Sequence, residues 1–406
     1  MTLAEVDLSP DAFVADTPHD TFRFLRREAP VFWYDKHAGT DPAFWVLSRY
    51  EDVKYVSKNP QLFSSAARGA TLNAPADPDR LEALRAIMLN MDPPQHRRFR
   101  NLVNKAFTPR MINQLQQAVY SMAKKIVDGI APRGECEFVD EVAALLPLEV
   151  ICEMVGVPES DRKALYDISN RLIGFDDPEF STSEEDGMMA SIELFAYASQ
   201  VAERARTHPG DDLATALINA EIDGDRLTEL EFNSFFLLLI VAGNETTRTV
   251  TANGMHYLMS NPDQRQLVLD DPALLPSAIE EILRLNPPVH YFRRVALADT
   301  ELRGVPIEAG QSVTLWYPSA NRDEDVFPRA DQFDVRRSPN DHLAFGIGEH
   351  FCLGSNLARM ELRVIIAELL RRLPDMEHAA PRRRLRSNFI NGVKEMRVRF
   401  TPEAGA

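Results

Sequence analysis

The apolar positions of this chain recur mainly at the spacing of α-helices. Residues 111 to 208 show this pattern almost throughout. After Thr228, the segment FNSFFLLLIVAGNETTRTVTANGMHYLM is at first apolar on almost every side, which predicts a helix buried through the middle of the protein. A final long helix is predicted from about Leu353 to Arg372, where Pro374 ends it. Its apolar face is predicted to carry Leu353, Leu357, Met360 and Val364.

Strands are predicted in two short apolar stretches near the N-terminus. Residues 30–34 and 44–47 have the composition of a β-hairpin. Ser48 and Glu51 then form the pattern of a capping box, which predicts a short helix to about Lys58.

The middle of the chain alternates irregular sequence with further helix signals. Residues 63–90 contain one short helical stretch and are long enough to form a functional loop. The sequence Asp92-Pro93-Pro94 predicts a helix N-cap with prolines in the first turn, and that helix should continue to about Phe107. Another helix is predicted over 276–286, and residues 295–317 alternate as short strands and turns.

The chain has 406 residues, of which 45% are apolar. Such a length favours two or three domains. However, the sequence has no Gly/Ser-rich linker, internal repeat or low-complexity tract to separate them. We therefore expect one domain over residues 1–406, with a β-rich part at about 20–60 and a helical core at about 92–406.

Features of secreted and membrane-spanning proteins are not evident in the sequence. The N-terminus lacks the basic start and apolar core of a signal peptide. The longest apolar run, Phe235 to Ala242, is far shorter than the roughly 20 residues that cross a bilayer. We expect a soluble cytoplasmic protein with no membrane span.

The net charge of −16 argues against nucleic acid as a partner. The segment from Gln95 to Arg110 nevertheless contains five basic residues and no acidic residue. Two interpretations remain open, a solvated helix face or a docking surface for an acidic protein. The basic residues are Arg97, Arg98, Arg100, Lys105 and Arg110.

The three cysteines are Cys136, Cys152 and Cys352, and no CxxC pair occurs. A zinc ribbon or a thioredoxin-like centre therefore has little support. Cys136 and Cys152 lie in ordinary sequence and are predicted to be plain thiols.

Cys352 is different because it stands in the string FGIGEHFCLG, immediately before the last predicted helix. The positive end of a helix dipole and nearby backbone N–H groups both favour a thiolate at such a position. Gly346, Gly348 and Gly354 let the backbone turn tightly and approach a flat ligand closely. The alternative is a glycine-rich turn with an incidental cysteine.

The ten-residue string resembles the haem-binding loop of the cytochrome P-450 superfamily, Phe-Gly-x-Gly-x-(His/Arg)-x-Cys-x-Gly, and fills every fixed position. The resemblance implies that Cys352 is the axial thiolate ligand of haem b iron, with Phe345 and Gly346 also against the haem. A thiolate on haem iron donates electron density and promotes O–O cleavage. It also implies a mainly α, single-domain P-450 fold, a triangular helical prism with a small β-rich region.

Glu281 and Arg284 are three residues apart, a spacing that brings their charges together on one helix face. Most pairs of this kind are surface salt bridges that contribute little. This pair also resembles the family's Glu-x-x-Arg motif, which implies a structural role, bracing the loop before Cys352.

The predicted buried helix contains Ala242-Gly243-Asn244-Glu245-Thr246-Thr247. On its own, the segment reads as a locally bent helix in which Thr hydroxyls bond to carbonyls one turn earlier. It resembles the family's Ala-Gly-x-(Asp/Glu)-Thr segment on the distal face of the haem. The resemblance implies that Thr246 hydrogen-bonds dioxygen and that Glu245 relays protons. Glu replaces the commoner Asp, and its longer reach changes the relay geometry.

His96 and Arg100 lie one helical turn apart and could grip one carboxylate. The alternative is a solvated pair. The family has His-x-x-x-Arg after an Asp-Pro-Pro helix start, which implies that these two residues bind a haem propionate. Arg294 and His350 match two further propionate positions, and Arg293 is an adjacent alternative to Arg294.

By resemblance, the enzyme is a haem-thiolate monooxygenase that inserts one atom of dioxygen into its substrate. The chain has no Gly-rich dinucleotide loop in a strand–turn–helix setting, so its electrons should come from a ferredoxin with an NAD(P)H-dependent reductase. The basic face near Arg97, Arg98 and Arg110 is the expected dock, and the protein is expected to be a monomer. The alternatives are a peroxide-driven haem enzyme and a haem-based sensor or carrier, but the Glu245–Thr246 pair disfavours both.

The resemblance also implies which residues meet the substrate. The expected contacts are mostly apolar, which favours a terpenoid, a steroid or a branched lipid. The loop over residues 63–89 should cover the mouth of the pocket. The expected substrate contacts are Leu238, Val241, Ala242, His290, Phe292 and Ile390.

Overall fold

The structure is a computed structural model of the whole chain. It describes residues 1–36, 43–72, 77–106, 109–173, 177–180, 184–222 and 224–403.

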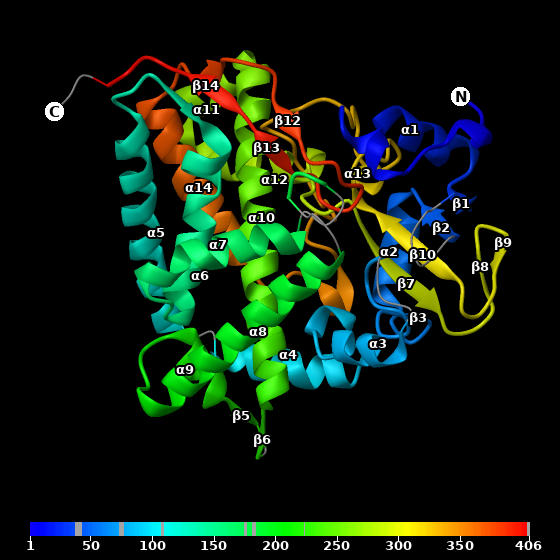
Figure 1. Cartoon of the computed structure of the whole chain (residues 1–406). Helices are drawn as coiled ribbons and strands as arrows, with labels where there is room; N and C mark the ends of the chain where they lie inside the picture. The colour runs from blue at the N-terminus through cyan, green and yellow to red at the C-terminus, as the bar shows by residue number, and fades with distance from the viewer. Residues whose placement is uncertain are drawn as a thin grey trace.

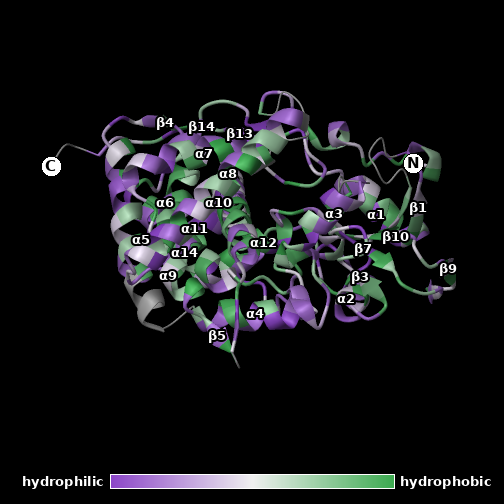
Figure 2. Ribbon diagram, turned by 60° about the horizontal axis from the view of Figure 1, so that its bottom comes forward, coloured by the Kyte–Doolittle hydropathy of each residue, from purple (hydrophilic) through white to green (hydrophobic). Residues whose placement is uncertain are grey.

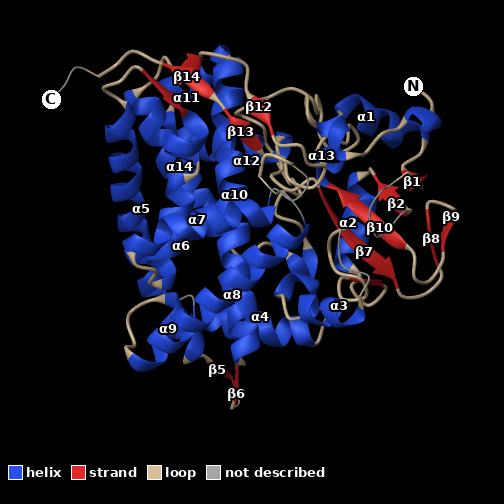
Figure 3. Cartoon of the chain, in the orientation of Figure 1, coloured by secondary structure: helices blue, strands red, loops and turns tan. Residues whose placement is uncertain are grey.

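Helices make up most of the described chain, as the sequence predicts (Figure 3). They are α1 (His19–Glu28), α2 (Tyr50–Lys58), α3 (Pro78–Arg85), α4 (Gln95–Ala106), α5 (Pro109–Ile130), α6 (Leu145–Val155), α7 (Glu159–Ile173), α8 (Glu184–Thr207), α9 (Leu213–Ile218), α10 (Glu229–Ser260), α11 (Pro262–Asp270), α12 (Leu275–Leu285), α13 (Tyr317–Ala320) and α14 (Ser355–Arg372).

Helix α10 runs through the middle of the helical part, with α6, α7, α8, α12 and α14 packed against it (Figure 1). It begins at a capping box, in which Thr228 Oγ accepts the Glu231 N–H and the Glu231 carboxylate accepts the Thr228 N–H. Most of its side chains are buried. The predicted central buried helix is therefore confirmed.

The strands gather mainly at one side of the molecule (Figure 3). They are β1 (Val31–Tyr34), β2 (Phe44–Leu47), β3 (Phe63–Ser64), β4 (Glu135–Glu137), β5 (Glu221–Ile222), β6 (Asp225–Arg226), β7 (Tyr291–Ala296), β8 (Thr300–Leu302), β9 (Val305–Ile307), β10 (Ser312–Trp316), β11 (Glu377–His378), β12 (Arg383–Arg384), β13 (Val393–Glu395) and β14 (Arg397–Arg399).

The largest sheet has five strands in the order β1-β2-β10-β7-β3. The predicted hairpin is confirmed, since β1 and β2 pair antiparallel. Strand β10 then pairs parallel with β2 and antiparallel with β7, so the sheet joins segments from both halves of the chain.

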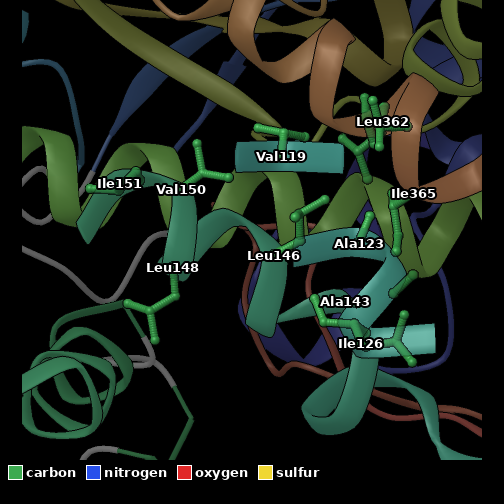
Figure 4. Close-up of a cluster of buried hydrophobic side chains, with 14 of the residues drawn as sticks. Val119, Ala123, Ile126, Ala143, Leu146, Leu148, Val150, Ile151, Leu362 and Ile365 are labelled. Carbon is green, nitrogen blue, oxygen red and sulfur yellow. The ribbon is translucent and has the colours of Figure 1, made fainter. Parts of the chain in front are cut away.

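The main core lies where α5, α6, α10 and α14 pack together (Figure 4). The helices are striped with hydrophobic and hydrophilic residues (Figure 2), and the apolar stripes supply this core. Each buried Leu, Ile or Val side chain contributes about 1.5–3 kcal/mol of transfer free energy. No helix in the described part of the chain is both long enough and apolar enough to cross a membrane.

The predicted capping box at Ser48 and Glu51 is wrong. Helix α2 begins at Tyr50 without a cap from its own side chains. The Ser48 hydroxyl donates to the Pro30 carbonyl (3.2 Å), and the Tyr50 N–H donates to Asp323 Oδ2 (2.9 Å). The cap is therefore supplied by a residue that is distant in sequence.

The predicted N-cap role of Asp92 is also wrong. Helix α4 begins at Gln95, and the His96 N–H donates to the main-chain oxygen of Asp92 (2.9 Å). The Asp92 carboxylate instead accepts hydrogen bonds from the Ser65 N–H (2.8 Å) and the Ser64 hydroxyl. It therefore ties the start of α4 to strand β3.

Candidate active site

A cavity lies between α10, α4, β7 and the loop that precedes α14. Most of its lining is apolar. The apolar lining residues are Met88, Leu89, Ile151, Met154, Phe235, Leu238, Leu239, Ala242, Pro288, Val289, Phe292, Ala344, Phe345, Ile347, Phe351, Leu353, Leu357 and Ala358.

Cys352 borders this cavity from the loop before α14. Its N–H donates to the Phe345 carbonyl (2.9 Å), which closes the loop. Gly346 and Gly348 have φ angles of 68° and 79°, in the left-handed region that favours glycine. A Cβ on Gly348 would also lie 2.7 Å from the Ser57 carbonyl oxygen. The loop therefore depends on glycine at these positions.

Two opposing effects act on the pKa of Cys352. Backbone N–H groups of Gly354 and Ser355 do favour its thiolate, and helix α14 begins at Ser355, three residues beyond the sulfur. Burial is the larger effect, and it raises the pKa of Cys352 above its usual value. A bound metal cation would supply the charge that stabilises the thiolate in this buried position.

Four nitrogen-bearing side chains gather at one edge of the cavity, namely His96, Arg100, Arg294 and His350. The rings of His96 and His350 are 4.3 Å apart, and His350 Nε2 lies 3.2 Å from Ser65 Oγ. His96 Nδ1 is buried and has no hydrogen-bond partner among the residues that the structure describes. The structure thus brings the four predicted propionate residues together.

Among the described residues, the carboxylates of Asp92 and Glu349 lie near this cluster, but both are engaged by other groups. Burial, reinforced by the positive charge of neighbouring arginines, lowers the pKa of His96 to about 4 and that of His350 to about 2. Burial also lowers the pKa of Arg294. The nearby carboxylate of Glu349 is engaged by Arg97. A flat group with carboxylates at one edge, such as haem, fits this donor set.

Arg293, the alternative to Arg294, lies on the opposite face of β7. Its Nε donates to the Gly69 carbonyl (3.0 Å), and its N–H donates to the Ala70 carbonyl (2.7 Å). Because successive strand residues point to opposite faces, only Arg294 of this pair lines the cavity.

Thr246 lines the cavity from α10, on the wall that also carries Ala242. Its hydroxyl donates to the Ala242 carbonyl (2.6 Å), one turn earlier. A Cβ on Gly243 would come within 2.3 Å of Ile151 Cδ1 of α6. Glycine at this position therefore lets α10 and α6 approach closely beside the site.

Glu245 points to different surroundings from Thr246. It does not line the cavity, and it is only 1% exposed. Its carboxylate pairs with Arg248, and Oε1 accepts the Thr249 hydroxyl at 3.3 Å. Burial raises the pKa of Glu245, and the Arg248 guanidinium opposes that shift. The two predicted catalytic residues are thus neighbours in sequence with separate environments.

Glu281 and Arg284 form a fully buried ion pair with two contacts of 2.8 Å. Arg284 Nη1 also donates to the carbonyl oxygens of Asn321 (2.8 Å) and Ala330 (2.7 Å). Asn321 Oδ1 in turn accepts the Leu343 N–H at 2.7 Å. The pair is therefore connected to the segment that leads to Cys352.

Of the six expected substrate contacts, three line the cavity and three do not. Leu238, Ala242 and Phe292 are lining residues. The expectation for His290 is wrong, because its ring is buried between Thr17 Oγ1 and the Asn388 carbonyl, each at 3.2 Å.

Val241 and Ile390 are also outside the cavity lining. They pack in a small apolar cluster with Leu385 and Phe389 beside it. Val241 is three residues after Leu238 on α10, beside the cavity-lining face, and it packs against the cluster that also contains Val289.

Comparison with known proteins agrees with this geometry. The family model "Cytochrome P450" matches residues 136–377. Along 98% of its length, the chain is 41% identical to a steroid C26-monooxygenase of Rhodococcus jostii and covers 84% of that relative. It is also 41% identical to a methyl-branched lipid omega-hydroxylase of Mycobacterium tuberculosis over 98% of the chain and 95% of the relative.

The chain belongs to the cytochrome P450 family.

Solved structures of other P450s have the same mainly α fold with a small β region. A Mycobacterium marinum P450 in complex with pseudoionone has a TM-score of 0.89 and 38% identity, covering 98% of both chains. A Bacillus megaterium P450 in complex with corticosterone has a TM-score of 0.84 and 32% identity, covering 95% of this chain and 98% of that one. Since its curated relatives are monooxygenases and hydroxylases, this protein is a P450 monooxygenase.

Sequence reasoning missed several residues that line the cavity of this P450. The clearest case is Glu361 of α14, a buried acid on the wall near Leu357. The signal was present, because Glu361 is four residues after Leu357, on the predicted inward face. Other unpredicted lining residues are Met88, Phe235, Val289 and Tyr317.

The basic segment is less free than its sequence indicates. Arg97 Nε donates to Glu349 Oε1 (2.9 Å), and Arg98 Nη2 donates to Asp225 Oδ1 (2.7 Å). Arg100 turns toward the cavity, and the side chain of Arg110 lies outside the described residues. Arg97 nevertheless keeps a 64% exposed side chain.

Proposed function

We propose that this P450 binds haem b with the Cys352 sulfur as the axial ligand of iron and hydroxylates a hydrophobic small molecule. The observation that carries the proposal is one cavity with Cys352 on one wall, Thr246 on another and an uncompensated cluster of basic side chains at its edge. When bound, the haem supplies the iron that activates dioxygen, of which one atom enters the substrate and the other leaves as water.

The basic cluster would hold the haem carboxylates. Arg100 and Arg294 bring permanent positive charge, which suits charge-assisted hydrogen bonds to carboxylates. His96 and His350, whose pKa values lie well below neutrality, would act as neutral hydrogen-bond donors. The free Nδ1 of His96 supports this assignment, because a buried donor without a partner is costly.

Thr246 and Glu245 are assigned to proton handling. Because the Thr246 hydroxyl donates its proton to the Ala242 carbonyl, its oxygen can accept a hydrogen bond from the cavity side. Burial raises the pKa of Glu245, which favours holding a proton in this interior. To deliver that proton into the cavity, the Glu245 side chain would turn from Arg248 toward Thr246.

The proposed substrate is a steroid, a terpenoid or a methyl-branched lipid. The apolar walls formed by Leu238, Val289 and Phe292 suit an alkyl group and offer it few hydrogen-bond partners. The relatives named as a steroid C26-monooxygenase and a methyl-branched lipid omega-hydroxylase support the same class.

The proposal is tested by spectroscopy on the purified protein. The reduced carbon monoxide complex should show the red-shifted Soret band of thiolate ligation, and Cys352→Ala should abolish it. Steroids, terpenes and branched fatty acids should be screened for the low- to high-spin shift that follows displacement of water from the iron. A Soret band of the same position in Cys352→Ala would refute the ligand assignment, and turnover with peroxide alone would favour a peroxide-driven enzyme.

We also propose that a ferredoxin-type protein delivers the electrons. The dock would be the face on which Arg97 and the 38% exposed Phe351 lie, beside the loop that carries Cys352. Positive charge beside an exposed aromatic ring suits an acidic partner protein.

A further inference from the structure

Glu361 is a carboxylic acid sealed into the wall of the haem cavity. It lies on α14, and its side chain lines the cavity together with Leu357 and Ala358, on the side of Cys352. It is only 2% exposed. Its Oε2 atom is buried and has no hydrogen-bond partner in the described part of the chain.

Two arginines, one on α14 and one on α10, are each engaged by a carboxylate other than Glu361. On α14 itself Arg359 binds Glu280 of α12 at 2.7 Å, and on α10 Arg248 binds Glu245. Burial is therefore the cause that raises the pKa of Glu361 to about 8. The other Asp, Glu, Lys, Arg, His and Cys residues of α14 and of the helices that pack against it, among the described side chains, are Lys124, Lys125 and Asp128 on α5, Glu149, Cys152 and Glu153 on α6, Glu229, Glu231 and His256 on α10, Glu281 and Arg284 on α12, and Arg363, Glu368, Arg371 and Arg372 on α14.

With Cys352 bound to iron as proposed, the other titratable side chains of the cavity hold one charge state around neutral pH. The pKa of His96 is lowered to about 4, that of His350 is lowered to about 2 and that of Tyr317 is raised to about 12. Arg100 and Arg294 remain charged. Glu361 is therefore the cavity-lining group, among the described residues, that is poised to change its charge.

We propose that at alkaline pH Glu361 takes up a proton when an electron enters the haem, so that reduction of this P450 is coupled to proton uptake at the cavity wall. This inference rests on the proposed function because it requires bound haem. One electron from a ferredoxin-type donor reduces ferric iron to ferrous iron. One proton from solvent binds the Glu361 carboxylate to form a neutral carboxyl group, and the net charge of the interior stays constant.

The physical reason is that charge in a sealed cavity is poorly screened. An added electron disfavours a nearby carboxylate that has no counter-ion, so the proton affinity of Glu361 rises on reduction. By linkage, a carboxylate at Glu361 disfavours the reduced state in return. The reduction potential should therefore fall as pH rises through the pKa of Glu361 and stay level at lower pH, where the group is already neutral.

The test is the reduction potential of the holoenzyme as a function of pH, in the wild type, in Glu361→Gln and in Glu368→Gln. A tenfold change in proton activity corresponds to about 59 mV for a one-electron couple. The wild type should approach this slope per pH unit above about pH 8. Glu361→Gln should keep the low-pH potential throughout, because glutamine mimics the neutral acid. Glu368→Gln removes the same charge from the same helix outside the cavity lining and should follow the wild type.

Infrared redox-difference spectra of the wild type provide a second measurement if Glu361→Gln fails to retain haem. Reduction at alkaline pH should produce the carbonyl band of one protonated carboxyl group and a matching loss of carboxylate bands. The same potential–pH curve in wild type and Glu361→Gln, or no new carboxyl band in the wild type, would overturn the inference. Absence of the thiolate-type Soret band would instead refute the proposed function.

Discussion

At the residue scale, the site combines groups that sequence motifs identify with groups that only folding brings in. Cys352, His96, Arg100, Arg294 and His350 could all be predicted from motif likeness, and all border one cavity. The prediction that His290 contacts the substrate failed because its Nε2 lies within hydrogen-bond distance of Thr17 Oγ1, from near the N-terminus. Glu361 was missed although its spacing from Leu357 places it on the predicted inward face of α14, because acidic side chains are seldom buried.

Glu281 provides a prediction at this scale. Replacing it with Gln leaves the buried guanidinium groups of Arg284 and Arg337 without their counter-charge. We expect a loss of about 3–5 kcal/mol in the free energy of unfolding, measured by denaturant titration, together with reduced haem content. Glu82→Gln removes an exposed pair of the same spacing with Arg85 and should change little. Equal stability of the two variants would contradict a bracing role.

At the element scale, the apolar periodicity correctly predicts the long helices. The residues that cap the starts of α2 and α4 were not predicted correctly. The extents of α10 and α14 follow from apolar spacing and flanking caps or prolines. The start of α2 could not be predicted in this way, because the Tyr50 N–H donates to Asp323, which is distant in sequence. Asp92 does not cap α4 with its side chain, because its carboxylate accepts the N–H of Ser65, next to strand β3. Tertiary partners of this kind leave no trace in the local sequence.

The contact between α10 and α6 gives a second prediction. Gly243→Ala should push its new methyl group into Ile151 Cδ1 and destabilise the protein by about 1–3 kcal/mol. Adding Ile151→Val removes that carbon and should restore part of the loss, as a double-mutant cycle of unfolding free energies would measure. Gly129→Ala in α5 is the control, since no atom of another described element lies within 4 Å of its new Cβ. Purely additive effects would show that the close approach is unimportant.

At the scale of the whole molecule, the mainly α fold could be predicted from helix content and the motif likeness. The sheet order could not be predicted, because short strands carry too little pattern to identify distant partners. The ion pairs of the basic segment could not be predicted either, because their partners are distant in sequence. Arg97 pairs with Glu349 of the Cys352 loop, and Arg98 pairs with Asp225 of β6.

The proposed docking face gives the third prediction. Arg97→Glu should raise the KM for the ferredoxin-type donor severalfold and weaken its dependence on ionic strength, because exposed charges act mainly on association. Steady-state reduction at several salt concentrations measures both effects. Arg399→Glu is the matched control, because Arg399 also pairs with one glutamate and lies on β14, at the opposite end of the molecule from α4 (Figure 1). Equal effects of both substitutions would argue against this dock.

The parallel pairing of β2 with β10 has a consequence for biosynthesis. The Thr314 hydroxyl reaches the Trp45 carbonyl across 269 residues of chain. During synthesis on the ribosome, the β2 edge of the first hairpin therefore stays unpaired until β10 has emerged. Arg294, proposed to bind a haem carboxylate, is on β7, the other neighbour of β10, so a newly made chain would complete that proposed site only after β10 has emerged.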